Sequence, residues 1–279
     1  MFGQERIEFK TPDQVRVMRR AGLVVADALD AVRAQVRPGM TTVDLDTVAA
    51  AVISAAGATP SFLGYDGYPA TVCVSVNDEV VHGIPGARVL EPGDIVSIDC
   101  GAIVDGWHGD SALTLVLPEA HPADVALSDA TERAMWAGIA ALALADRLGA
   151  VGEAVEDVVD AMDTALNDGM RYGVVEEYVG HGIGTAMHQP PDVLNYRARA
   201  RGARVRPGLC VAVEPMLTRG TQSTRVLEDG WTVVTADGSR AAHWEHTVAV
   251  LESGIWVLTA RDGGAARLLE LGVTVARLD

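Results

Sequence analysis

The order of helix-forming and strand-forming segments is nearly repeated in the two halves of this 279-residue chain. Thr11, Pro12 and Gln14 predict a helix that begins with a capping box. Apolar residues recur at helical spacing in residues 11–39 and 42–57, and short β-branched runs separated by Gly, Pro and Asp follow. Two further helices and a second group of strands repeat this order. We therefore predict one α+β domain over residues 1–279, with helices packed against a sheet. The other predicted elements are helices at 123–148 and 153–167, ended by Gly149 and Gly169, and strands at 71–76, 94–104, 107–117, 210–217, 231–235, 243–251 and 255–259.

Composition and charge indicate in which cell compartment the protein works and which binding partners are disfavoured. Three cysteines, an odd number and far apart, favour free thiols in a reducing compartment, so we expect the cytoplasm. The formal net charge of −16 disfavours bulk electrostatic binding to DNA or to an anionic membrane. No apolar run approaches the roughly 18 residues of a membrane span. The short N-terminal segment 1–10 is charged and has no signal-peptide core.

Two carboxylates, Asp99 and Asp110, fall in neighbouring predicted strands. A turn at residues 104–105 would place them directly opposite each other, whereas a turn at Asp105-Gly106, a strong hairpin signal, would make them diagonal neighbours on one face. Like charges across a strand pair destabilise a sheet, and a pair of metal ions would offset the repulsion. A solvated hairpin with two surface carboxylates is the alternative.

Further candidate ligands lie in a glycine-rich segment and beside two apolar runs. Glycines flank His181 and let its backbone approach a ligand closely, while His188 precedes a rigid Gln-Pro-Pro segment. Glu214 and Glu245 adjoin apolar strands, where an unpaired charge is costly, and His82 follows a buried strand. One imidazole and four carboxylates suit two divalent ions, which leaves the second imidazole for the chemistry. Loop or strand-edge positions without a function remain the alternative for each residue.

Together these segments resemble methionine aminopeptidase. The resemblance runs from about Thr11 to Leu258, with every motif in order, and implies a "pita-bread" (creatinase/aminopeptidase) fold: an antiparallel sheet with two related halves and helices packed on the outside. The short interval between Glu214 and Glu245 leaves no room for the insert of type 2 enzymes, so the chain is similar to the short bacterial type 1 form. The matching segments are residues 77–85, Asp99 with Asp110, residues 180–188, Glu214-Pro-Met and Glu245-His-Thr.

The resemblance also implies residue roles. Glu214 would be the general base, and His82 and His188 would hydrogen-bond the scissile amide. Two divalent ions, whether Co, Mn, Fe or Zn, would be bridged by Asp110 and Glu245. The full implied ligand set is Asp99, Asp110, His181, Glu214 and Glu245. The implied wall of a methionine pocket is Tyr65, Tyr68, Cys73, Met187 and Trp231.

The activity implied by the resemblance is removal of the initiator methionine from nascent proteins and peptides, by a monomer that prefers a small second residue. Met187, Phe62 and Gln189 depart from the Phe, Cys and Glu common in bacterial relatives, so the substrate preference stays open. Five arginines at 197–206 contrast with the acidic chain. They suggest a transient contact with the ribosome, and a solvated loop and strand edge is the alternative.

Two other classes of protein compete with this interpretation. X-Pro aminopeptidases and prolidases share the fold and the five ligands, but His82 lies too early in the sequence for their large N-terminal domain. A non-catalytic binding protein on this fold would be expected to have lost ligands, and all five are present.

Overall fold

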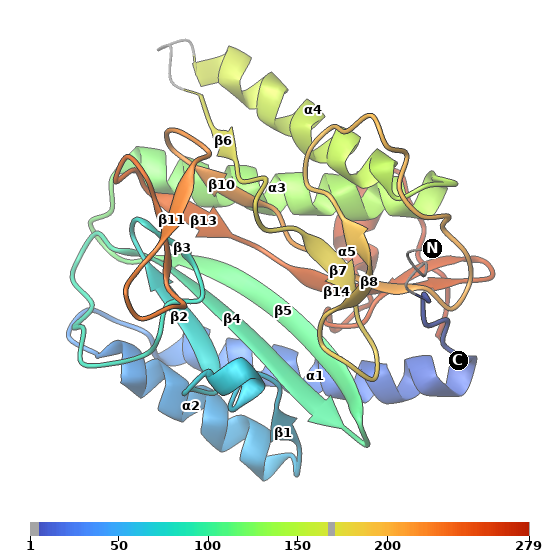
Figure 1. The fold of residues 1–279 in the computed structure, drawn as a ribbon, viewed down its shortest axis with the longest axis horizontal. Coiled ribbons are helices and arrows are strands. Elements are labelled where there is room, and N and C mark those ends of the chain that lie inside the picture. The colour runs from blue at the N-terminus through green and yellow to red at the C-terminus, as the bar shows by residue number, and fades with distance from the viewer. Residues whose placement is uncertain (1–5, 167–170, 279) are drawn as a thin grey trace.

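The computed structural model describes residues 6–166 and 171–278, and its strands lie between two helix pairs (Figure 1). The first pair is α1 (Pro12–Gln35) and α2 (Thr42–Ala55), and the second is α3 (Pro122–Leu144) and α4 (Gly149–Leu166). A short helix, α5 (Ala265–Glu270), follows the last strand. This arrangement agrees with the predicted α+β class, with helices on the outside. Residues 1–5 of the predicted N-terminal segment lie outside the described residues.

All strand pairings among the described residues are antiparallel. In the first half, β4 (Ile95–Val104) pairs with β1 (Thr59–Pro60), β2 (Val72–Val76) and β5 (Trp107–Val116). The largest sheet of the second half has the order β15 (Gly254–Val257), β14 (His246–Leu251), β9 (Cys210–Val213), β7 (Gly180–Gly182) and β8 (Gln189–Val193). Two smaller sheets have the orders β13 (Ala241–His243), β10 (Met216–Thr218), β6 (Gly173–Val174) and β11 (Thr224–Val226), β12 (Val233–Thr235), β3 (Glu79–Val81).

Helix α1 begins at the predicted capping box and lies close against β5. The Thr11 hydroxyl accepts from the Gln14 amide, and the Gln14 side chain accepts from the Thr11 amide at 2.8 Å. A Cβ on Gly109 would lie 2.6 Å from the nitrogen of Gly22, and a Cβ on Gly22 would lie 2.4 Å from the carbonyl oxygen of Leu258. Helix α1 can lie this close to β5 and to Leu258 because neither Gly22 nor Gly109 has a side chain.

The β4–β5 hairpin adopts the register set by a turn at Asp105-Gly106. Val104 pairs with Trp107, and the two turn residues have φ of 49° and 80°, as a two-residue hairpin turn with positive φ at both positions requires. Asp99 is opposite Ala112, and Asp110 is opposite Gly101. The two carboxylates are thus diagonal neighbours on one face, and the register that would place them directly opposite is wrong.

The junction between α3 and α4 differs from the prediction. The third helix ends at Leu144, and Gly149 begins α4 instead of ending α3. Backbone hydrogen bonds tie the intervening segment to residues 201–205: Leu148 donates to Ala203 and Gly149 to Arg201, both at 3.0 Å. These distant partners compete with the helix for the same backbone groups. The predicted end of the fourth helix, at 167–169, lies outside the described residues.

The two long strands predicted at 210–217 and 243–251 are each broken in two. The breaks occur at Glu214-Pro215, between β9 and β10, and at Trp244-Glu245, between β13 and β14. They lie side by side, because Val213 pairs with His246 and Met216 pairs with His243. Proline has no amide hydrogen to donate to the ladder. Glu214 and Glu245 therefore project from the same gap between two sheets.

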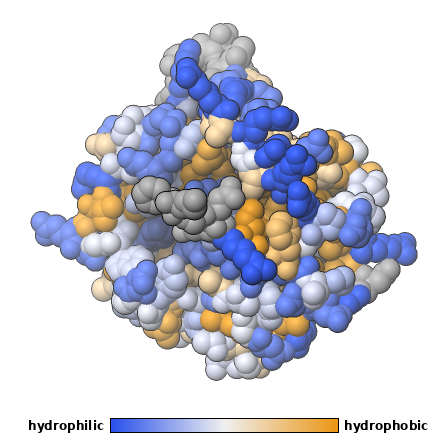
Figure 2. Space-filling model, turned by 45° about the vertical axis from the view of Figure 1, so that its right-hand side comes forward, coloured by the Kyte–Doolittle hydropathy of each residue, from blue (hydrophilic) through white to orange (hydrophobic). Residues whose placement is uncertain are grey.

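Separate apolar cores support the two halves. One joins α1 and α2 to β2 and β4, and another joins α3 and α5 to β9, β14 and β15. Hydrophilic residues cover much of the face shown in Figure 2, as the net charge of −16 leads one to expect. Within the described ranges, every helix is too short or too polar to cross a membrane.

Candidate active site

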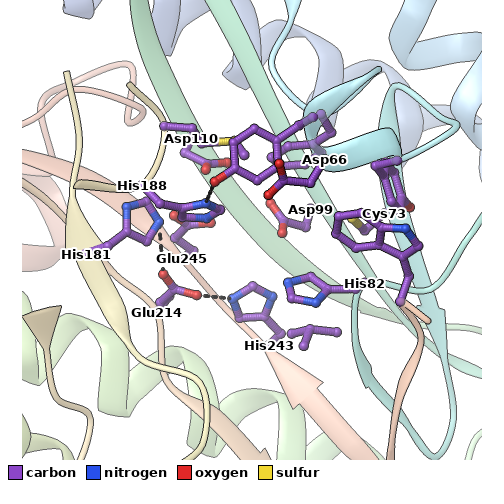
Figure 3. Close-up of a pocket in the computed structure, with 16 residues that line it drawn as sticks. Asp66, Cys73, His82, Asp99, Asp110, His181, His188, Glu214, His243 and Glu245 are labelled. Carbon is purple, nitrogen blue, oxygen red and sulfur yellow. Dashed lines mark hydrogen bonds and ion pairs between the residues drawn. The ribbon is translucent and has the colours of Figure 1, made fainter. Parts of the chain in front are cut away.

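One cavity, with a volume of about 190 Å³, collects every predicted site residue (Figure 3). The five predicted metal ligands meet there with His82 and His188, and the five predicted pocket residues form the remainder of the wall. The strand breaks, the β4–β5 hairpin, β7 with the loop after it, and the turn at η1 (Tyr65–Gly67) supply most of these side chains. The others come from β2 and from the segments after β3 and before β12. The fold thus brings side chains from positions as far apart as 65 and 245 into one cavity. The cavity is also lined by Phe62, Asp66, Val81 and His243.

The carboxylates at the floor of the cavity are buried and incompletely hydrogen-bonded. Asp110, Glu214 and Glu245 are 3%, 8% and 2% exposed. One oxygen each of Asp99, Asp110 and Glu245 has no hydrogen-bond partner among the described residues. Buried polar atoms are seldom left without partners, so these oxygens indicate a group that the protein alone does not supply.

Burial changes the proton affinity of all four carboxylates. It raises the pKa of Glu214 to about 8 and that of Asp99 to about 7. Burial, followed by the charges of neighbouring carboxylates, raises the pKa of Asp110 and of Glu245 well above the ordinary range. A cation among these groups would reverse this tendency, because it stabilises their ionised forms.

His181 presents an unprotonated nitrogen to the carboxylates. Its Nδ1 donates to the carbonyl oxygen of Gly182 at 3.0 Å, and burial lowers its pKa to about 3, so the ring is neutral with the proton on Nδ1. The Nε2 lone pair faces Oε1 of Glu214 at 3.3 Å (Figure 3). Either a proton on Glu214 or a bound cation lets these two electron-pair donors lie this close, and a carbonyl that orients the opposite nitrogen is typical of a metal-binding histidine.

The donor set fits a divalent ion. Ligand atoms of Asp110, His181 and Glu245 lie within 4.8 Å of one another, and all three residues are buried. Imidazole with carboxylates suits Mn, Fe, Co and Zn. Asp99 and Glu214 line the same cavity. The chemistry of this cluster therefore fits divalent-metal binding.

Two further imidazoles line the cavity, and the ring of His188 lies against that of His181, with ring centroids 4.4 Å apart. His188 Nδ1 lies 2.9 Å from the Tyr65 hydroxyl (Figure 3), and burial lowers the pKa of His188. His82 has a φ of 61°, unusual for a non-glycine residue, and its ring contacts Tyr178 and Trp231. Burial, then the neighbouring His243, lowers its pKa to about 4. Both rings are neutral near pH 7.

An apolar cluster forms the remaining wall. Tyr68 is fixed by its hydroxyl, which donates to the carbonyl oxygens of Val72 and Gly83 at 3.1 and 3.0 Å. Its ring packs edge-on against Trp231 and Phe62. Aromatic faces, a methionine and a thiol together form a polarizable surface suited to a thioether. The buried members of this cluster are Phe62, Tyr68, Ala70, Cys73 and Met187.

Sequence reasoning missed His243 as a site residue. Its side chain is 2% exposed, its Nε2 has no hydrogen-bond partner among the described residues, and that atom lies 3.5 Å from Oε2 of Glu214. A signal was available, because His243 and Glu245 are two residues apart and so project to the same side of an extended chain. Asp66 and Val81, also on the cavity wall, gave no comparable signal.

The fold and the buried centre define a metallopeptidase, and comparisons with known proteins agree. The model of metallopeptidase family M24 matches residues 16–252. The prolidase from Pyrococcus furiosus has a TM-score of 0.69 at 17% identity, over 90% of this chain and 65% of that one, which shows a shared fold alone. The match to this family confirms the pita-bread fold.

Much higher identities come from one group within the family. Methionine aminopeptidase 1 from Mycobacterium tuberculosis is 52% identical over 258 residues, which cover 92% of this chain and 96% of the relative. Its counterpart from Bacillus subtilis is 42% identical over 250 residues, 90% of this chain and 98% of that one. The crystal structure of methionine aminopeptidase from Thermotoga maritima has a TM-score of 0.86 at 38% identity and covers 92% of this chain and 100% of that one. The chain therefore belongs to metallopeptidase family M24, and within it to the methionine aminopeptidases.

Proposed function

We propose that this protein hydrolyses the first peptide bond of peptides and nascent proteins that begin with methionine. The observation that carries the proposal is the convergence, in one cavity, of the acidic metal centre, two neutral imidazoles and a polarizable apolar wall. The high identity to proteins named methionine aminopeptidase supports it. The cytoplasm, where protein synthesis supplies such chains, is the proposed location.

Two divalent ions would occupy the centre. The residues that would hold them are Asp99, Asp110, His181, Glu214 and Glu245. The unpartnered oxygens of Asp99, Asp110 and Glu245 would be available as ligand atoms. The bound ions would supply Lewis acidity and lower the pKa of a water molecule toward neutrality.

Glu214 is the proposed general base. Its carboxylate lies on the cavity wall, and bound cations would keep it ionised, so that it can accept a proton from the attacking water. The same carboxyl group would then return this proton to the nitrogen of the departing peptide. Water is a poor nucleophile until this proton is removed, so loss of Glu214 should abolish turnover.

The two imidazoles are proposed to bind the scissile amide. With the Tyr65 hydroxyl donating to Nδ1 at 2.9 Å, the neutral ring of His188 carries its proton on Nε2. This N–H would donate to the carbonyl oxygen as negative charge develops there. His82 would act similarly, to a smaller degree. A preorganised donor of this kind stabilises the transition state by about 2.7–4 kcal/mol.

Methionine would bind with its thioether against Tyr68, Cys73, Met187 and Trp231. A small second residue is the proposed preference, because the side chains of Tyr65 and His188 line the cavity and would limit the space for that residue. Phe62 and Met187 both belong to the buried apolar cluster, so their departures from the usual residues act on the methionine side chain itself.

Methionine release from a Met-Gly peptide tests the proposal. The protein should be assayed after chelation and after reconstitution with Mn, Fe, Co or Zn in turn. Release of methionine with at least one metal, and no cleavage of an X-Pro peptide, is expected. Absence of release with every metal would overturn the proposal, and preferential X-Pro cleavage would replace it with a prolidase-type activity.

We also propose a transient contact with the ribosome through arginines beside the N-terminal segment. Arg204 and Arg206 line one surface pocket with Arg6 and Arg147, and an excess of cations favours phosphate backbones. Arg197 does not share this role, because it pairs with Glu156 and other acidic residues of α4. Arg204→Glu/Arg206→Glu should lower co-sedimentation with ribosomes at low salt, and Arg16→Glu/Arg20→Glu on α1 serves as the matched charge control. Equal co-sedimentation of both variants would refute the contact.

A further inference from the structure

Glu8 makes a cluster of hydrogen bonds to the loop that carries His188. Its Oε2 accepts from the Thr185 amide at 3.1 Å and from Nε2 of Gln189 at 2.9 Å, and its Oε1 accepts from the Thr185 hydroxyl at 2.8 Å. One carboxylate thus connects both ends of residues 185–189. Glu8 itself lies outside the cavity, in the segment that precedes α1.

The segment that carries Glu8 is itself anchored. Lys10, the only lysine of the chain, is 6% exposed. Its ammonium donates to the carbonyl oxygen of Glu8 at 2.9 Å, and its backbone amide donates to Gly208 at 2.7 Å. A Cβ on Gly184 would lie 2.1 Å from Oε2 of Glu8 and 2.5 Å from Cε of Lys10. Segment 8–10 therefore packs directly against the loop and leaves space there only for glycine.

The side chain of Glu8 stays ionised at neutral pH. Partial burial acts to raise its pKa, but hydrogen bonds from Gln189 and Thr185 outweigh this effect and lower the pKa to about 2. The carboxylate is thus a permanent acceptor at physiological pH. Hydrogen bonds to a charged group are stronger than neutral ones, so the loop is held firmly on this side.

We infer that Glu8 is a positioning residue for His188, which it holds in place from outside the cavity through Thr185 and Gln189. The Tyr65 hydroxyl holds the same imidazole from inside, at 2.9 Å from Nδ1. Gln189 is the direct neighbour of His188 in the chain, so its side-chain bond to Glu8 restricts the backbone at the imidazole. The inference rests on the proposed function, in which His188 binds the scissile amide.

The pairing also explains the glutamine at position 189. Its amide nitrogen lies 2.9 Å from the Glu8 carboxylate, whereas a glutamate at this position would place two carboxylates at that distance, and they would repel each other. Glutamine at 189 and glutamate at 8 are therefore matched as donor and acceptor. A swap of the two residues should preserve the bond, and either single change should weaken it.

Steady-state kinetics with a Met-Gly peptide test the pairing. Glu8→Ala should lower kcat by about tenfold, the size expected for losing hydrogen bonds to a charged group, with KM and metal content little changed. Gln189→Glu should lower kcat at least as much, and Glu8→Gln/Gln189→Glu should recover most of the loss. Glu252→Gln, at an exposed turn after β14, removes one charge elsewhere and should leave kcat unchanged. A double variant no better than Gln189→Glu alone would overturn the pairing.

Two further measurements separate positioning from general stabilisation. In a His188→Ala background, Glu8→Ala should have no additional effect on kcat, and a further tenfold loss there would overturn the inference. Hydrogen exchange of the metal-free protein gives a readout independent of activity: Glu8→Ala should speed exchange at the Thr185 amide and leave Ile183, which donates to Cys210, protected. Unchanged exchange at Thr185 would also overturn the inference. If the wild-type protein releases no methionine, the proposed function fails, and the exchange result still decides whether Glu8 holds the loop.

Discussion

His243 and Glu214 face each other across the gap between the broken strands, with His243 Nε2 3.5 Å from Glu214 Oε2. The other oxygen of Glu214 lies 3.3 Å from His181 Nε2, so the carboxylate lies between two imidazoles (Figure 3). The backbone of His243 is held in turn, because its amide donates to Thr114 and its carbonyl accepts from the same hydroxyl. The proposed general base thus has a fixed neighbour on the side away from His181.

Removal of His243 should slow turnover without removing the metals. His243→Ala leaves Oε2 of Glu214 without its neighbour, so we expect kcat to fall by about 10–100-fold, as for other groups that orient metal-site carboxylates. His243→Gln keeps a donor and should retain more activity than the alanine variant. Metal content by atomic absorption serves as the control. Wild-type kcat in His243→Ala would contradict this role.

His181 and His188, the two histidines of the glycine-rich segment, should have different functions. His181→Ala removes a ligand and should weaken metal affinity, whereas His188→Ala should keep the metals and lose about 2.7–4 kcal/mol of transition-state stabilisation. Isothermal titration with Mn²⁺ or Co²⁺, followed by kinetics at saturating metal, measures both quantities. Equal metal affinity of the two variants would show that the division of roles is wrong.

The sequence was sufficient to predict the features that depend on neighbours along the chain. The capping box at Thr11 and the turn at Asp105-Gly106 are decided by residues within a few positions, and both formed. The convergence of Asp99, Asp110, His181, Glu214 and Glu245 followed from the resemblance and from the cost of burying unpaired charges. Whether each of these residues binds metal stays a prediction.

Features that depend on distant partners were not predictable in this way. The end of α3 at Leu144 is decided by hydrogen bonds to residues 201–205, which no local pattern reveals. The strand break at Glu245 arises where two sheets meet, although the apolar run continues through it, whereas Pro215 gave a local signal for the break at Glu214. His243 was overlooked because its role depends on Glu214, a residue in a different strand.

Metal affinity should rise with pH. Burial raises the pKa of Asp99 to about 7 and of Glu214 to about 8. Above about pH 6.5, where the buried histidines are largely neutral in both states, the metal-free folded chain therefore binds more protons than the unfolded chain, and its free energy of unfolding should fall as pH rises from about 6.5 to 8. Metal binding must release these protons.

Calorimetry in buffers of different ionisation enthalpy measures this proton release. Titrations with Mn²⁺ at pH 6, 7 and 8 should show affinity increasing and protons released, with Glu252→Gln, a surface carboxylate variant, behaving as the wild type. Chemical denaturation of the chelated protein at the same pH values gives the stability trend. A metal affinity that does not change with pH would contradict the raised pKa values of the carboxylates.

Packing of α1 on β5 should tolerate no side chain at Gly109. A Cβ there would lie 2.6 Å from the backbone nitrogen of Gly22, so Gly109→Ala must displace the helix and should lower the free energy of unfolding by about 1–3 kcal/mol. Urea denaturation of the metal-free protein measures the loss. Gly86→Ala is the matched control, since its Cβ would meet only one atom, at 3.9 Å. Equal stability of the two variants would show that the helix moves freely.

The candidate ligands come from both halves of the chain. Asp99 and Asp110 belong to the β4–β5 hairpin, whereas His181, Glu214 and Glu245 follow α4. An ion held by Asp110, His181 and Glu245 would therefore add a removable cross-link between two halves that buried apolar clusters already join. Loss of the metal would then remove one of the links between the halves as well as stop the proposed chemistry.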